Sequence, residues 1–114
     1  MCLVVIVLTE TDCLNTLLEE LSQEGIMGAT ILSSHGMAHS LYEYDELRFF
    51  GSLRILLDPQ RKESKTILIV CKEELVPVIS KVTNRVTGGL DKPDTGILFT
   101  VPVNYVEGIP TQND

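Results

Sequence analysis

The segment CLVVIVL, residues 2–8, is apolar at every position and rich in β-branched residues. Such a run is typical of a strand that is buried on one face and packed or paired on the other. Three similar segments follow, ATILS at 29–33, TILIVC at 66–71 and ILFTVPV at 97–103. Pro102 lacks an N–H donor, which favours a sheet edge or a strand end for the last of them. The sequence therefore predicts four strands.

A first helix is predicted between the first two strands. Its apolar residues recur at helical spacing, while Glu19, Glu20 and Glu24 take the other face. Thr11 or Asp12 can cap its start, and a glycine directly after it, Gly25, ends it. The apolar stripe comprises Leu14, Leu17, Leu18 and Leu21.

A second helix is predicted over residues 73–86, between the last two strands. Pro77 lies in its first turn, where a missing N–H breaks no helical hydrogen bond. The pair Gly88-Gly89 closes it. Its apolar stripe comprises Leu75, Val76, Val78, Ile79, Val82 and Val86.

The order β-α-β-β-α-β is the ferredoxin-like split βαβ arrangement of the α+β class. It yields a four-stranded antiparallel sheet with two helices on one face. At 114 residues the chain has the size of one domain, residues 1–114. Because the strands are apolar on both faces and no third layer is available, we expect another copy of the chain to cover the free face.

Charge, the first residues and the cysteines indicate which binding partners and which cellular compartment to expect. A net charge of −7 without a basic stripe argues against nucleic acid and anionic membranes. Residues 1–8 lack the charged start of a signal peptide, so we expect a cytoplasmic protein. Cys2, Cys13 and Cys71 form no CxxC motif, and we expect reduced, mostly buried thiols.

The stretch 35–64 is longer than compact domains normally leave between strands, and such connections are usually functional or disordered. Its apolar content predicts that it packs on a neighbouring surface rather than staying solvated. His35 and His39 have the spacing that places two imidazoles on one helix face toward a metal. Gly36 interrupts them and no third ligand has a matching spacing, so we expect no metal.

The stretch from Thr87 to Gly96 is a glycine-rich turn between a helix and a strand. Its backbone amides are candidates for an anion-binding nest, and a plain long turn explains it equally well. No Gly-x-Ser-x-Gly elbow or Walker lysine occurs, and no Cys or Ser has a His at a recognisable distance. We therefore expect no enzyme.

Four motifs resemble one family. GIMGATI at 25–31 and HGMAHS at 35–40 resemble the second strand and the T-loop entry of nitrogen-regulatory PII signal transduction proteins. Thr87-Gly88 and GILF at 96–99 resemble their B-loop and last strand. The resemblance spans almost the whole chain and divides it into a single PII-like domain with a T-loop-like insertion at 35–64, a B-loop-like turn at 87–96 and a C-terminal tail at 104–114.

This resemblance implies a homotrimer that senses a small-molecule effector, ATP or ADP, in the clefts between subunits. It also implies a T-loop that docks on a membrane transporter or a metabolic enzyme in the regulation of nitrogen utilisation. Ile97 stands where the family has a phosphate-binding lysine, so much of the countercharge for a triphosphate is missing. The resemblance matches Thr30, Gly36, Thr87 and Gly88 to the family's ligand positions. The residues that we assign to the ligand are these four together with Met37, His39, Gly89 and Lys92, of which Lys92 is a candidate to replace the missing countercharge.

Two alternatives stay open beside a PII-like sensor. The first is a trimeric metal-binding protein that resembles the CutA family and uses His35 and His39. The second is an interaction module without any ligand, in which residues 41–57 form a fixed contact between subunits.

Overall fold

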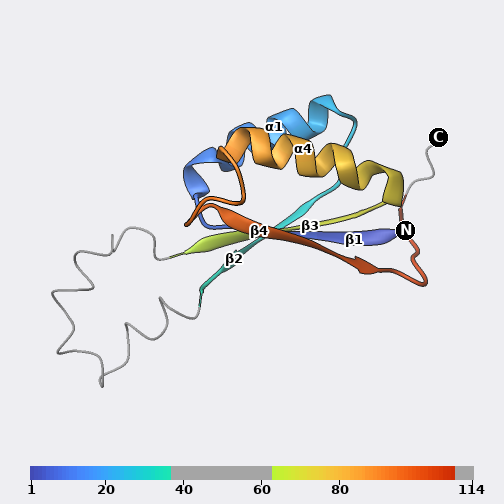
Figure 1. Cartoon of the computed structure of the whole chain (residues 1–114). Coiled ribbons are helices and arrows are strands. Elements are labelled where there is room, and N and C mark those ends of the chain that lie inside the picture. The colour runs from blue at the N-terminus through green and yellow to red at the C-terminus, as the bar shows by residue number, and fades with distance from the viewer. Residues whose placement is uncertain (37–62, 110–114) are drawn as a thin grey trace, which may run out of the picture.

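The computed structural model describes residues 1–36 and 63–109. It confirms the α+β, ferredoxin-like architecture with a four-stranded antiparallel sheet and two helices (Figure 1). The elements in chain order are β1 (Cys2–Leu8), α1 (Leu14–Gln23), β2 (Thr30–Ser34), β3 (Ser64–Cys71), α4 (Val76–Thr87) and β4 (Gly96–Pro102).

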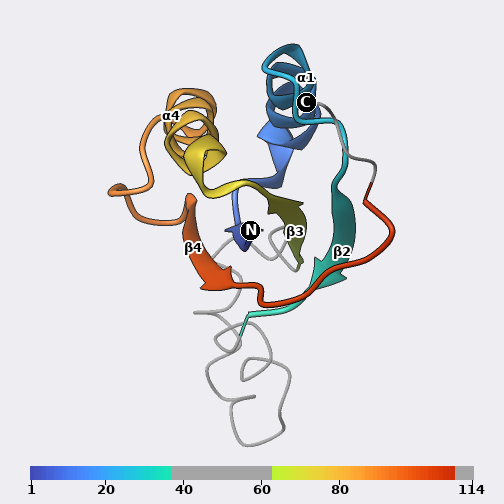
Figure 2. The ribbon, with the colours of Figure 1, turned by 90° about the vertical axis from the view of Figure 1, so that its right-hand side faces the viewer.

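The sheet has the strand order β2-β3-β1-β4, and every neighbouring pair is antiparallel. β1 lies in the interior, whereas β2 and β4 are the two edges. β4 is an edge strand that ends at Pro102, as its missing donor predicts. Figure 2 shows both helices above one face of the sheet, with α4 on the β4 side and α1 on the β2 side.

The core lies between the helices and one face of the sheet. Val4, Ile6 and Leu8 of β1 are fully buried there, as are Leu17 of α1 and Ile79 of α4. Because side chains alternate along a strand, the residues between them point to the other face, which no described helix or strand covers. The register places nine apolar side chains on this open face: Leu3, Val5, Val7, Leu32, Leu68, Val70, Ile97, Phe99 and Val101.

The helix boundaries follow the glycines but not the predicted cap. Gly88 adopts positive φ directly after α4, and Gly25 does so one residue after the C-cap of α1, Glu24, as expected of helix-ending glycines. The predicted cap of α1 by Thr11 or Asp12 is wrong. These residues form a short 3₁₀ turn, and the helix begins one turn later with no side-chain cap.

No helix in the described ranges 1–36 and 63–109 has the length and apolarity needed to cross a membrane.

Candidate functional site

The two candidate segments, the connection between β2 and β3 and the turn before β4, attach at the same end of the sheet. Leu8 of β1 lies opposite Lys65 of β3 on one side and Gly96 of β4 on the other, and Ser33 of β2 lies opposite Lys65. The connection from β2 to β3 therefore starts and finishes at the same end of the sheet as the turn before β4 (Figure 1). We call it the loop end.

The residues assigned to the ligand fall on opposite edges of the sheet. Thr30 begins β2 on the open face, and Gly36 follows the end of that strand. Thr87 ends α4, and Lys92 belongs to the turn that leads to β4. Three inter-strand spacings, roughly 14 Å, separate the two edge strands. A single chain thus does not bring the two groups together. Two further positions, Met37 and His39, lie outside the described residues.

The turn after α4 uses its own amides. Gly88 adopts φ 88° and caps the helix. The N–H of Gly89 donates to the hydroxyl of Thr87 at 3.3 Å, and the N–H of Lys92 donates to the carbonyl of Gly89 at 3.1 Å. The N–H of Leu90 donates to the side-chain oxygen of Asn84 at 2.8 Å. These three amides therefore serve the turn itself rather than an anion-binding nest.

A buried hydroxyl holds the second half of the turn. Thr95 is 8% exposed, and its hydroxyl lies 2.9 Å from the carbonyl oxygen of Lys92 and 3.2 Å from that of Gly89, both as acceptors. The backbone carbonyl of Thr95 accepts the N–H groups of Thr9 and Glu10. The turn is thus fastened to the residues that follow β1, so its conformation is set by the fold.

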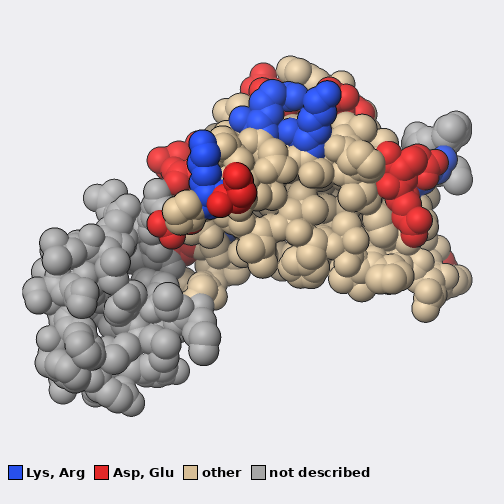
Figure 3. Space-filling view, viewed as in Figure 1, with Lys and Arg blue, Asp and Glu red and all other residues tan. Residues whose placement is uncertain are grey.

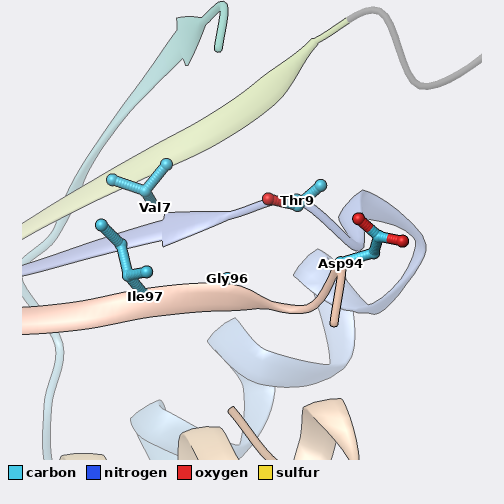
Figure 4. Close-up of a pocket in the computed structure, with 5 residues that line it drawn as sticks. All are labelled: Val7, Thr9, Asp94, Gly96 and Ile97. Carbon is cyan, nitrogen blue, oxygen red and sulfur yellow. The ribbon is translucent and has the colours of Figure 1, made fainter. Parts of the chain in front are cut away.

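A shallow depression of about 290 Å³ lies beside this turn. Figure 4 shows the side chains of Val7 and Ile97 close together at one end, with Thr9 and Asp94 at the other. Its lining is Val7, Thr9, Asp94, Gly96 and Ile97, which includes no Lys or Arg and none of the residues assigned to the ligand. The sequence signalled Asp94 and Gly96 only as turn residues, and Val7 and Thr9 carried no signal beyond a strand and its end.

Hydroxyl groups join the two strands where the 35–63 connection attaches. Ser34 of β2 lies 2.7 Å from the hydroxyl of Ser64 and 2.8 Å from that of Thr66, both on β3. On the opposite face, the ammonium of Lys65 donates to the hydroxyl of Ser33 at 2.9 Å. These contacts fix the two ends of the connection to each other.

Metal ligands are sparse in the described part of the chain. No group of three or more His, Cys, Asp or Glu side chains is positioned to hold an ion there. His35 is among the described residues, whereas its sequence partner His39 is not.

Comparison with known proteins does not assign the chain to a family. No family model and no curated protein matches the chain. The resemblance to PII proteins rests on the quoted motifs. The ferredoxin-like fold by itself hosts many unrelated functions.

Proposed function

We propose that this protein is a PII-like signal transduction protein rather than an enzyme. It forms a homotrimer in the cytoplasm, senses a small-molecule effector in clefts between subunits, and acts on a transporter or metabolic enzyme through residues 35–64. The observation that carries this proposal is the uncovered apolar face of the sheet.

The open face is apolar enough to require a cover. Besides the nine aliphatic and aromatic side chains, the strands place only serine and threonine side chains on this face. None of the strand residues on this face is charged. Ile97 is 57% exposed and Phe99 is 45% exposed. In Figure 3 charged side chains lie over the helices and at the two ends of the molecule, and the underside along β4 lacks them. Contiguous apolar surface of this kind usually marks an interface.

A second copy of the chain would cover this face. It would also bring together candidate residues that lie far apart within one chain. Closed homo-oligomers are the commonest way in which soluble proteins cover such surfaces. Within one chain Thr30 and Lys92 lie on opposite edges, whereas association of several copies brings the β2 edge of one next to the β4 edge of another. A ligand between subunits then meets both groups.

ATP and ADP are the first ligands to test, and the structure limits how they bind. The amides of Gly89, Leu90 and Lys92 are already used inside the turn. In the described part of the turn the ammonium of Lys92 is the positive group, and Asp91 and Asp94 flank it. Nucleotide binding at this turn therefore depends on the side chain of Lys92.

The oligomer is tested by sedimentation equilibrium of the wild type and of Phe99→Asp. We expect a wild-type mass three times the 12.6 kDa of the chain and a monomer for the variant, because a carboxylate at the centre of a buried apolar face lacks a partner. Thr100→Asp is the matched control, since the next residue of the same strand points to the other face. A monomeric wild type at tens of micromolar contradicts the proposal.

The effector is tested separately by thermal unfolding with ATP or ADP. A ligand at a hundredfold its Kd stabilises the folded protein by about 2.7 kcal/mol, which is readily measured. We expect a shift for the wild type and none for Lys92→Ala. Equal shifts for both proteins argue against the proposed site, and no shift with a confirmed trimer favours a different effector.

One observation favours a second candidate, the interaction module without a ligand. Three amides of the turn at 87–96, those of Gly89, Leu90 and Lys92, already donate to acceptors in the turn or in α4, so these three need no anion. If the trimer forms but no nucleotide or small anion changes its stability, this candidate replaces the sensor. Metal analysis of protein purified without an affinity tag tests the CutA-like alternative at His35 and His39.

A further inference from the structure

Two cysteines face each other at the end of the sheet that lies away from the loop end. Cys2 begins β1, and its register partner is Cys71, the last residue of β3. Both side chains belong to the core and are 4% and 8% exposed. Neither thiol is part of a disulfide. The proposed sensor function uses neither residue.

The backbone pattern decides what this pair is able to form. The N–H of Val103 donates to the carbonyl of Met1 at 3.2 Å, so the polar groups of Met1 face β4. Because these groups alternate along a strand, those of Cys2 face β3, which makes Cys2 and Cys71 a hydrogen-bonded pair. Their Cα atoms are then about 5.5 Å apart, with the Cβ atoms at a similar separation.

This separation disfavours a disulfide but leaves room for a bridging atom. A disulfide holds its Cβ atoms about 3.8 Å apart, so forming one here requires the two central strands to move. With the metal–thiolate distance of about 2.3 Å found for zinc, a linear sulfur–metal–sulfur unit spans about 4.6 Å. Such a unit fits between side chains that project in parallel from this pair.

We propose that Cys2 and Cys71 form a two-coordinate site for a thiophilic monovalent cation, with Cu(I) as its occupant. Thiolates are the ligands that select Cu(I). Each thiol releases one proton, and the two sulfurs each donate an electron pair to the ion. The bound unit carries a net charge of −1 and no electron is transferred. Zinc fits poorly, because it takes four ligands and no third ligand joins the pair within the described residues.

The position of the pair gives a metal ion access to it. Access comes through the strand ends, since Cys2 and Cys71 are terminal residues of β1 and β3 and strand ends open more readily than strand centres.

Titration with Cu(I) against a coloured chelator tests the site on the full-length reduced protein under argon. We expect the wild type to withdraw one equivalent per chain from the chelator. Cys2→Ser and Cys71→Ser should each lose this equivalent. Cys13→Ser is the matched control and should retain it, because the Cys13 thiol lies apart from the pair and donates to the carbonyl of Glu10 at 3.0 Å.

A second measurement uses only the wild-type protein, so its result does not depend on whether the cysteine variants fold. X-ray absorption of the loaded wild type should show two sulfur neighbours and no nitrogen. Withdrawal of copper by Cys71→Ser equal to that of the wild type, or nitrogen in the first coordination shell, overturns the proposal. Rapid loss of two hydrogens by mass on treatment with a disulfide oxidant, with Cys2 linked to Cys71, also overturns it, because the pair is then an oxidisable dithiol.

Discussion

Gly96 shows how strictly one position is determined. It begins β4 with φ 149°, and a Cβ there lies 2.5 Å from the carbonyl oxygen of Val7 and 3.3 Å from the Cα of Leu8. Backbone atoms of a central strand cannot move aside as a flexible side chain does. The close approach of β4 to β1 at the loop end therefore requires glycine.

We expect Gly96→Ala to lower the free energy of unfolding by about 2 kcal/mol or more, because both the clash and the backbone conformation oppose a Cβ. Urea unfolding followed by circular dichroism measures the change. Gly28→Ala is the control, since nothing lies within 4 Å of the added Cβ there. A loss at position 96 no larger than that at position 28 contradicts the packing described for this end of the sheet.

The Cys71 thiol makes the free energy of unfolding depend on pH in the alkaline range. Its pKa is raised by burial from 9.0 to about 11 in the folded protein, so the unfolded chain loses this proton first as pH rises. The folded state then binds more protons than the unfolded state between pH 9 and 11, and stability falls across this window.

We expect the metal-free wild type to lose on the order of 1 kcal/mol more than Cys71→Ser between pH 8.5 and 11. Urea unfolding at several pH values measures this difference, and comparison with the variant cancels the titration of other groups. A constant difference between the two proteins across the window indicates that the thiol ionises equally in both states.

At the scale of elements, α1 and α4 are joined by two kinds of contact. Leu17 and Ile79 are completely buried between the helices and the sheet. On the surface, the guanidinium of Arg85 donates twice to one carboxylate oxygen of Glu20, at 2.6 and 3.1 Å. The carboxylate and guanidinium stay partly solvated, so the buried contact dominates the docking of the helices.

We expect Leu17→Ala to destabilise the protein by about 3 kcal/mol through the cavity that it leaves. Glu20→Ala, one turn along the same helix, should cost less than about 1 kcal/mol, and its effect should shrink in high salt. Chemical denaturation at low and high ionic strength measures both. Equal costs for the two variants show that the ion pair matters more than its exposure allows.

The elements could be predicted because each depends on local pattern. The run at residues 2–8 coincides with β1, and the predicted 29–33, 66–71 and 97–103 lie within two residues of the observed limits of β2, β3 and β4. The predicted helix at 73–86 begins with a 3₁₀ turn, Glu73–Leu75, before α4 proper. Apolar periodicity fixes the burial of a segment but does not distinguish a 3₁₀ turn from the first turn of an α-helix.

The candidate site was less predictable because it depends on contacts between distant residues. Asn84 orders the turn through Leu90, yet in the sequence it is one polar residue of a helix. Thr95, whose buried hydroxyl donates to the carbonyl of Lys92, likewise looks like an ordinary turn residue in the sequence. Only the folded structure shows that Thr30, on the edge strand β2, and Thr87, at the end of the helix on the β4 side, lie apart although the PII resemblance groups them (Figure 2).

At the scale of the whole molecule, the proposed trimer would link folding to association through the open face. If three copies bury Phe99 and its neighbours, the assembly stabilises each chain by mass action. We expect the wild-type Tm to rise with protein concentration between about 1 and 100 µM, and the Tm of Phe99→Asp to be lower and independent of concentration. Differential scanning calorimetry measures both. A wild-type Tm that stays constant while the protein is trimeric means that the trimer does not dissociate on unfolding.

The pairing of Ser34 with Ser64 has a consequence for how such a protein diversifies. These residues are thirty positions apart in the chain, yet they are neighbours in the sheet and their hydroxyls are in contact. Whatever lies between them departs from and returns to one place, so the sheet requires of it only that its ends meet. The entropy of closing a flexible connection grows by only about 0.6 kcal/mol for each doubling of its length. Evolution, or an engineer exchanging this segment for another, is therefore free to change the segment while the sheet that carries it stays intact.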